Sequence, residues 1–257
     1  MASPQRVIIT GASSGLGAAL ARHYAGRGAT LGLIARRQSE LERLRAAFTV
    51  ACEIYPLDVR DGAAIDAAAR DFTGKHGCPD IIIANAGVSV GTLTEFAEDR
   101  RVFQAVVDIN LIGMVNSFQP FLSAMRARGN GTLAGIASVA GFRGLAGNGA
   151  YCASKSAAIT WLEALRTELY GSGVSVVCVC PGYIDTPMTR VNRFRMPFLI
   201  SADDAAQRIA RAIENKRRLA VIPWPMALVS VLLRAMPGWL FDRLASRAPR
   251  KPRDVAV

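Results

Sequence analysis

Short apolar runs alternate with longer segments of helical periodicity along most of this chain, and this alternation is the strongest constraint on its fold. The runs span residues 7–10, 30–35, 53–56, 81–84, 132–136, 174–179 and 219–222, and the helical segments span residues 15–26, 39–48, 62–76, 99–127, 151–170 and 202–215. Several runs lack polar alternation, as expected for strands covered by helices on both faces. The pattern predicts an α/β fold with a doubly wound parallel sheet of about seven strands and a C-terminal helical extension.

Length and composition indicate one large folded unit. The chain has 257 residues, of which 51% are hydrophobic and 20% charged, so it can bury a substantial core and is not a disordered protein. No Gly/Ser linker or internal repeat divides the first 190 residues. We therefore expect one α/β domain over residues 1–222 and an apolar, basic extension over residues 223–257.

The formal net charge of +11 is concentrated near the C-terminus, where the last 68 residues carry +9 of it. No recognition helix or aromatic RNA-reading surface accompanies this charge, so nucleic-acid binding is not indicated. The five cysteines are odd in number and irregularly spaced, which argues against a disulfide framework and for a reducing compartment. Because no signal peptide is visible either, we expect a cytoplasmic location.

No metal site and no hydrolase site is expected. Cys178 and Cys180 fall in one core strand, and we expect their side chains on opposite faces of it, where they could not share a metal. The two histidines, His23 and His76, fall in predicted helices away from any serine and aspartate pair. Cys152 is expected to be a small packing residue rather than a nucleophile.

A glycine-rich turn with the sequence TGASSGLG joins the first apolar run to the first helical segment, at residues 10–17. Glycines permit a tight turn and a close backbone approach, and the N-terminus of the following helix favours a negatively charged ligand. The turn is therefore a candidate pyrophosphate site. Its GxxxGxG spacing differs from the GxGxxG dinucleotide fingerprint, so by itself it also fits a plain strand-to-helix connection.

Two arginines follow the second apolar run, where a dinucleotide-binding sheet reads the ribose of its ligand. An acidic residue there would bond the 2′-hydroxyl of NAD, whereas Arg36 and Arg37 suit a 2′-phosphate through charge-assisted hydrogen bonds. We therefore favour NADP(H) over NAD(H), and two arginines that merely face solvent are the alternative. Asp58, after the third run, is a candidate for the adenine edge or an ordinary turn residue.

A tyrosine and a lysine four residues apart form the strongest chemical motif. Tyr151 and Lys155 share one face of a predicted helix, so the ammonium favours the phenolate and lets the tyrosine exchange a proton near neutral pH. Ser138 lies thirteen residues before Tyr151, just beyond a predicted strand and hence at the carboxyl edge of the sheet. These three side chains are the candidates for acid–base chemistry.

Together these motifs resemble the short-chain dehydrogenase/reductase family, over residues 5–189, and the resemblance implies a Rossmann-type fold. It implies a catalytic tetrad of Asn110, Ser138, Tyr151 and Lys155. It also implies cofactor contacts from Gly11, Ser13, Ser14, Gly15, Leu16, Gly17, Arg36, Arg37, Asp58, Val59, Asn85, Ala86, Gly87, Tyr151, Lys155, Pro181, Gly182, Ile184 and Thr186.

The resemblance further implies hydride transfer between NADP(H) and a carbonyl or alcohol carbon. Tyr151 would exchange the proton, Lys155 would depress the pKa of the tyrosine and bond the nicotinamide ribose, Ser138 would hold the substrate oxygen, and Asn110 would support a water. We expect reduction of a hydrophobic ketone such as a 3-oxo lipid or acyl chain. The alternatives are a dehydrogenase of a steroid or small secondary alcohol and a non-catalytic NADP-sensing or scaffold protein. Family members commonly form homo-oligomers.

Two apolar segments bear on the substrate and on partners. Residues 188–200 match the family's mobile substrate lid, and their apolar side chains either contact a hydrophobic substrate or pack on the core. Residues 219–233 are almost uncharged but too short to span a bilayer. With the basic residues that follow, the extension fits a helix lying on an anionic membrane surface, and the alternatives are closing the pocket or packing a homo-oligomer.

Overall fold

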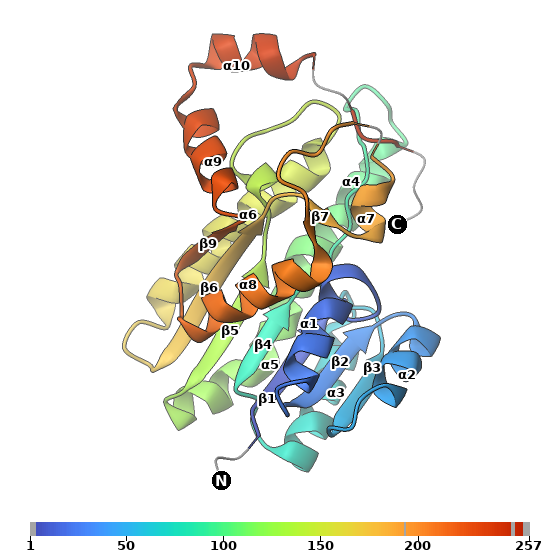
Figure 1. Cartoon of the computed structure of the whole chain (residues 1–257), viewed down its shortest axis with the longest axis vertical. Helices are drawn as coiled ribbons and strands as arrows, with labels where there is room; N and C mark the ends of the chain where they lie inside the picture. Colours follow the sequence, from blue (N-terminus) through green and yellow to red (C-terminus); the bar gives the residue numbers. More distant parts are fainter. Residues whose placement is uncertain (1–3, 193, 248–249, 254–257) are drawn as a thin grey trace.

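The computed structural model describes residues 4–192, 194–247 and 250–253. Its elements along the chain are β1 (Arg6–Thr10), α1 (Gly15–Ala25), β2 (Thr30–Ala35), α2 (Gln38–Ala46), β3 (Cys52–Pro56), α3 (Gly62–His76), β4 (Ile81–Ala84), α4 (Asp99–Val107), η1 (Asp108–Ile112), α5 (Gly113–Arg128), β5 (Gly131–Ile136), η2 (Val139–Gly141), α6 (Gly149–Glu168), β6 (Val174–Pro181), β7 (Ile184–Asp185), α7 (Pro187–Arg190), β8 (Ile200–Ser201), α8 (Ala202–Glu214), β9 (Leu219–Ile222), α9 (Pro225–Ala235) and α10 (Gly238–Ala245). Figure 1 shows their arrangement.

Seven parallel strands form the central sheet in the order β3-β2-β1-β4-β5-β6-β9. The direction of winding reverses between β1 and β4, so the loops after these two strands diverge at the carboxyl edge of the sheet. Such a switch point is where open α/β sheets bind ligands. The expected doubly wound, Rossmann-type parallel sheet is confirmed, and the helical extension follows it.

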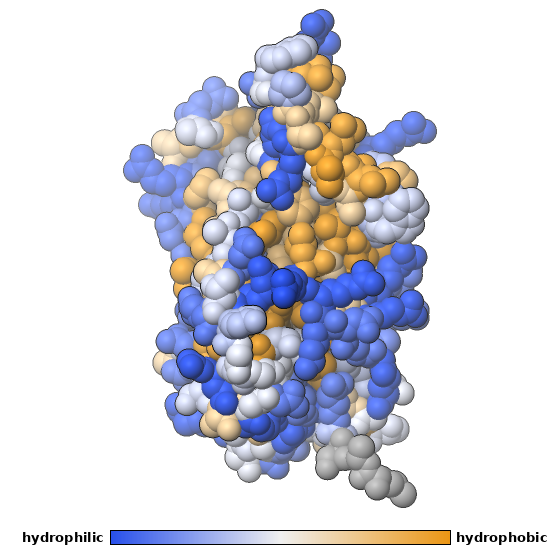
Figure 2. Space-filling model, turned by 90° about the vertical axis from the view of Figure 1, so that its left-hand side faces the viewer, coloured by the Kyte–Doolittle hydropathy of each residue, from blue (hydrophilic) through white to orange (hydrophobic). Residues whose placement is uncertain are grey.

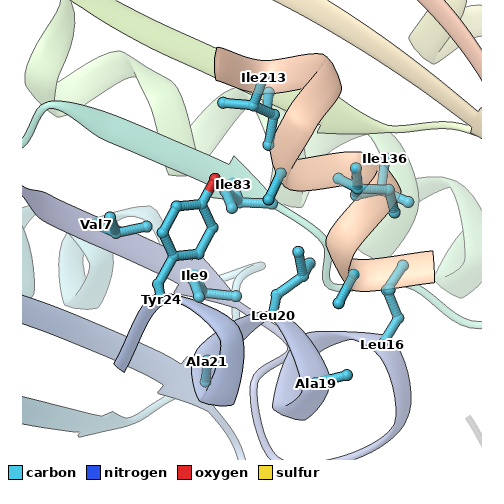
Figure 3. Close-up of a cluster of buried hydrophobic side chains, with 14 of the residues drawn as sticks. Val7, Ile9, Leu16, Ala19, Leu20, Ala21, Tyr24, Ile83, Ile136 and Ile213 are labelled. Atoms are coloured by element: carbon cyan, nitrogen blue, oxygen red, sulfur yellow. The ribbon is translucent and has the colours of Figure 1, made fainter. Parts of the chain in front are cut away.

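Helices cover both faces of the sheet (Figure 1). On one face α1, α2 and α8 enclose a cluster that includes Leu20, Tyr24 and Ile213 (Figure 3). On the other face α3, α5 and α6 pack over Phe72, Phe118 and related side chains. The strands are buried on both sides, which is why their sequences lack polar alternation.

The long helix expected over residues 99–127 is continuous from Asp99 to Arg128, but a π-helical turn at Asp108–Ile112 divides it into α4 and α5. Its length and composition alone would suit a membrane span. In the structure Phe118, Phe121 and Met125 of this helix are buried against the sheet, as in the core helix of a globular domain. The π turn places Asn110 in the interior.

The expected placement of Cys178 and Cys180 on opposite faces of their strand is wrong. Side chains two residues apart in a strand share a face, and the two buried sulfur atoms lie 3.8 Å apart in β6. Within the described residues no third cysteine, histidine or carboxylate joins them to form a metal-binding group. The short elements β7, α7 and β8 were also not predicted, because two- to four-residue elements have no periodicity to detect.

The C-terminal extension returns to the α/β domain at two places. Arg143 donates hydrogen bonds from Nη1 to the carbonyl oxygens of Leu233 (2.7 Å) and Met236 (3.0 Å), which holds the end of α9. Farther along, the Gly91 N–H donates to the carbonyl of Pro252, and Arg253 pairs with the buried carboxylate of Asp99. The extension is therefore packed on the domain rather than detached from it.

Candidate active site

A cavity of about 340 Å³ opens at the carboxyl edge of the sheet, beside the switch point between β1 and β4. It is lined by residues that follow β1, β2, β3, β4, β5 and β6. These include Gly11, Ser13, Ser14, Gly15, Leu16, Gly17, Arg36, Arg37, Asp58, Val59, Asn85, Ala86, Gly87, Ser138, Tyr151, Lys155, Pro181, Gly182, Ile184 and Thr186. The structure thus brings together every residue predicted for the site except Asn110, which is fully buried and does not border the cavity.

The glycine turn is shaped by positions where no side chain fits. Gly11 and Gly15 have φ angles of +66° and +52°, in the left-handed region that favours glycine. A Cβ at Gly17 would collide with the Gly11 carbonyl and lie 2.7 Å from Nδ2 of Asn85. Asn85 in turn donates from Nδ2 to the Thr10 carbonyl at 3.0 Å, which ties the turn to the loop after β4. The α1 N-terminus therefore faces the cavity with its backbone exposed to a ligand.

The two arginines occupy the mouth of the cavity next to the turn. Arg37 donates from Nη2 to Oγ of Ser14 at 2.7 Å and to Oγ of Ser13 at 3.0 Å. Arg36 lies 4.0 Å from the carboxylate of Asp58, whose closer partner is Arg60 at 2.7 Å. The hydrogen bonds from Arg60 hold the pKa of Asp58 below its usual range. A cluster of two guanidinium groups and two hydroxyl groups is suited to a phosphate.

The acid–base candidates lie deeper, at the end of β5 and on α6. The Ser138 hydroxyl accepts from the Ala140 N–H at 3.2 Å and faces the Pro181 carbonyl at 3.5 Å. Lys155 is buried and donates from Nζ to the Ile136 carbonyl at 2.7 Å. Its Nζ also lies 5.8 Å from the centroid of the Tyr151 ring. The four-residue spacing on α6 thus brings the lysine under the tyrosine.

Burial moves the pKa values of these two groups in opposite directions. Desolvation lowers the pKa of Lys155 to about 8, because an ammonium is costly to bury. Desolvation also raises the pKa of Tyr151, while the Ser138 hydroxyl acts to lower it. The net direction for Tyr151 differs from the expected depression by Lys155, since the loss of solvent around the phenolate is the largest effect.

Asn110 is fully buried in the π turn and is bound to the backbone of the neighbouring loop. Its Oδ1 accepts from the Val88 N–H at 2.8 Å, and its Nδ2 donates to the Val88 carbonyl at 3.0 Å and to Oγ of Ser154 at 2.9 Å. Both amide hydrogens are thereby used, which leaves the side chain no free N–H for a water. In this structure Asn110 positions the loop that follows Asn85-Ala86-Gly87.

Some lining residues were not singled out from the sequence: Leu57, Val88, Ile109, Ala137, Pro187 and Thr189 also border the cavity. Most are apolar residues beside predicted positions, and nothing in their type distinguishes them from core residues. The segment 188–200 has side chains in different surroundings. Met188 lines the cavity, Phe194 packs edge-on against Tyr183, and Phe198 is half exposed. Arg193 of this segment lies outside the described residues.

The residues that line the cavity fit a dinucleotide that carries an additional phosphate, such as NADP(H). The turn offers a cradle that any Cβ at Gly17 would fill, and the cluster of Ser13, Ser14, Arg36 and Arg37 supplies donors suited to an additional phosphate. Ser138 and Tyr151 border the same cavity.

Comparison with known proteins finds relatives and structural neighbours that are named as oxidoreductases or reductases. An uncharacterized oxidoreductase of Myxococcus xanthus (strain DK1622) is 37% identical over 248 residues, which cover 95% of this chain and 98% of the relative. The ketoacyl reductase HetN of Nostoc sp. is 34% identical over 225 residues, covering 84% of this chain and 77% of the relative. The structure of L-sorbose reductase from Gluconobacter frateurii, complexed with NADPH and L-sorbose, superposes with a TM-score of 0.75 at 25% identity, covering 86% of this chain and 95% of the neighbour.

A family model described as short chain dehydrogenase matches residues 5–196, three quarters of the chain and the part that builds the cavity. The match confirms the resemblance drawn from the glycine turn and the Tyr151 and Lys155 pair. This protein therefore belongs to the short-chain dehydrogenase family of oxidoreductases.

Proposed function

We propose that this protein is an NADP(H)-dependent reductase of a hydrophobic ketone, of the 3-oxo acyl or 3-oxo lipid class. One observation carries the proposal: Ser138, Tyr151 and Lys155 border the same cavity as the glycine turn and the arginine cluster. A carbonyl group held at the two hydroxyls would therefore share the cavity with a dinucleotide. A protein that only sensed NADP(H) would need no such proton-donating groups.

NADP(H), when bound, would supply the hydride. The chain's own groups would do the rest. Ser138, oriented by the Ala140 N–H, would donate a hydrogen bond to the substrate oxygen. Tyr151 would give the proton to that oxygen in reduction and take it back in oxidation, because its raised pKa keeps the phenol protonated at neutral pH. Lys155, held at the Ile136 carbonyl, would stabilise the phenolate that forms.

Asn110 would act as a positioning residue in this scheme. Its bonds to both backbone groups of Val88 hold one wall of the cavity in place. Loss of these bonds would leave the buried polar groups of the π turn and of Val88 unpaired.

The substrate class is supported by two kinds of observation. The ketoacyl reductase HetN shares 34% identity over most of the chain. The segment 188–200 also offers an apolar contact, because Met188 borders the cavity. L-sorbose reductase binds a sugar in a similar fold, so a polar substrate is the competing candidate.

The test is oxidation of NADPH and NADH by the purified protein against 3-oxo acyl chains of increasing length, steroids, short ketones and L-sorbose. We expect turnover with NADPH that improves with chain length. The variant Tyr151→Phe should lose turnover by about two orders of magnitude or more while still binding NADPH. Binding of NADPH with no reduction of any carbonyl, or full activity in Tyr151→Phe, would contradict the proposal.

A further inference from the structure

Helix α9 exposes an apolar face. Trp224, Leu228, Val231 and Leu232 are 64–69% exposed, and the spacing of these residues places them on one side of the helix. Surface helices ordinarily present polar side chains to solvent and apolar ones to the core. In α9 the buried side instead contains Met226 and the hydroxyl residue Ser230.

This orientation is held by specific contacts. Met226 packs against Gly182 so closely that a Cβ added at Gly182 would lie 2.7 Å from Cγ of Met226. The buried Ser230 hydroxyl has a partner within the helix itself, since it donates to the Met226 carbonyl at 2.7 Å, so its burial leaves no polar group unpaired there. Arg143 binds the carbonyls at the other end of α9 and stacks 4.2 Å from the ring centroid of Phe241 in α10. The apolar face of α9 therefore cannot turn inward without breaking the contacts of Met226 with Gly182 and of Arg143 with the end of the helix.

Helix α10 continues the exposed surface. Trp239 is 70% exposed and Leu244 is 55% exposed, while Phe241 points inward to Arg143. Figure 2 shows hydrophobic side chains gathered in the upper half of the molecular face that carries α9, bordered by hydrophilic ones. We call the exposed side chains of Trp224, Leu228, Val231, Leu232, Trp239 and Leu244 the α9–α10 patch.

Three arginines belong to the same segment of the chain as this patch, and the guanidinium of one of them, Arg234, lies 5.7 Å from the ring centroid of Phe142. Arg234, Arg243 and Arg247 lie on α9, on α10 and just after it, and Asp242 is the one carboxylate between residues 224 and 247. None of these three arginines forms an ion pair with a carboxylate in the described parts of the chain. Apolar residues with two tryptophans beside arginines are typical of helices that lie in a membrane interface.

We propose that the α9–α10 patch docks on an anionic membrane surface. The arginines favour this occupant over a second copy of the chain, because a two-fold contact would bring the same positive side chains of both copies together. Anionic lipid headgroups would instead neutralise them. The apolar side chains would enter the boundary between headgroups and acyl chains.

The location of the patch links it to the cavity. Gly182, which Met226 covers from the α9 side, borders the cavity itself. A membrane-docked α9 would therefore hold the site close to the lipid surface. This inference does not depend on the proposed substrate, since it rests on exposure and charge alone.

The experiment is co-sedimentation of the full chain with phosphatidylcholine vesicles, with and without phosphatidylglycerol. We expect binding to the anionic vesicles and much weaker binding to phosphatidylcholine alone. Leu228→Glu should weaken binding by about tenfold or more, the lower end of the effect of burying a leucine. Arg243→Gln and Arg247→Gln should each weaken it about fivefold, and added salt should remove this difference.

Tyr170→Glu is the matched control. Tyr170 is 89% exposed just beyond the C-terminal end of α6, and its replacement adds the same negative charge as Leu228→Glu. Circular dichroism and NADPH binding should be unchanged in Leu228→Glu, which shows that the variant is folded. The proposal fails if the anionic vesicles do not bind the protein, or if Leu228→Glu binds them like Tyr170→Glu. It also fails if the protein does not bind vesicles and light scattering shows a dimer that the Leu228→Glu substitution dissociates. In that case the patch would be the contact between two copies of the chain.

Discussion

Replacement of Arg37 by glutamine should selectively weaken the binding of NADPH. Arg37 is exposed at the mouth of the cavity, and its Nη2 is held by the hydroxyls of Ser14 at 2.7 Å and Ser13 at 3.0 Å. The guanidinium is thereby ordered before any ligand binds, which reduces the entropy lost on contact with a phosphate. Glutamine retains a hydrogen-bond donor at a similar distance but removes the positive charge.

The magnitude follows from the hydrogen bonding and the exposure of the guanidinium. A hydrogen bond to a charged group contributes about 1.5–3 kcal/mol. Because Arg37 is exposed to solvent, screening favours the lower end of that range. We therefore expect Kd for NADPH to rise about tenfold or somewhat more. NADH has no 2′-phosphate, so its Kd should stay within about twofold of the wild-type value.

The assay is titration of the nicotinamide fluorescence of NADPH and NADH with wild-type and variant protein at low ionic strength. Arg43→Gln serves as the control, because Arg43 is an exposed arginine of α2 that pairs with Glu40 and does not border the cavity. Higher salt should narrow the difference between wild type and Arg37→Gln. An equal loss for both nucleotides, or no loss for NADPH, would refute the assignment of Arg37 to the 2′-phosphate.

Three further predictions concern the turn, the buried lysine and the C-terminal segment. Gly17→Ala should abolish NADPH binding in calorimetry, because its Cβ would collide with the backbone of the turn, whereas Gly26→Ala, with its nearest neighbour 3.4 Å away, should bind normally. Lys155 should add up to about 1.4 kcal/mol per pH unit to the pH slope of the unfolding free energy between about pH 8 and 10.5, since burial lowers its pKa to about 8 and the unfolded chain binds this proton more tightly. Denaturant titrations of Lys155→Met should lose this contribution, whereas that of Lys251, whose pKa burial also lowers to about 8, should remain. Arg253→Ala should be cleaved faster by trypsin after Arg250, as followed by mass spectrometry, because it loses two hydrogen bonds to a buried carboxylate, and an unchanged cleavage rate would show that these bonds do not hold the segment.

Much of the fold was predictable because it depends on local rules, and most of the cavity lining was expected from the resemblance to the family. Strands and helices differ in the period of their apolar residues, so the order of elements could be derived from residues 7–222 without contacts. Glycine is required wherever a Cβ does not fit, as at Gly17, and a four-residue spacing places Tyr151 and Lys155 on one helix face.

Other features were decided by contacts between distant segments. The π turn at Asn110 and its bonds to Val88 join parts of the chain 22 residues apart, and no local pattern indicates them. The pKa of Tyr151 moves upward because of burial, which is a property of the folded environment rather than of the neighbouring lysine. A second example is the anchoring of the C-terminal segment, where Arg253 pairs with Asp99 across 154 residues.

The sequence by itself determined the α/β class and the order of the strands and helices, because periodicity is a local property. It indicated the residues at the carboxyl edge of the sheet partly from the ends of the expected strands and partly from the resemblance to the family. It also showed that the segment containing α9 is apolar nearly all round. Only the tertiary structure decided which side of α9 is buried, since that depends on Gly182 and Arg143, which come from other parts of the chain. The apolar and basic sequence of the extension already indicated contact with a membrane, but which side chains are exposed to make that contact is a consequence of packing that no periodicity contains.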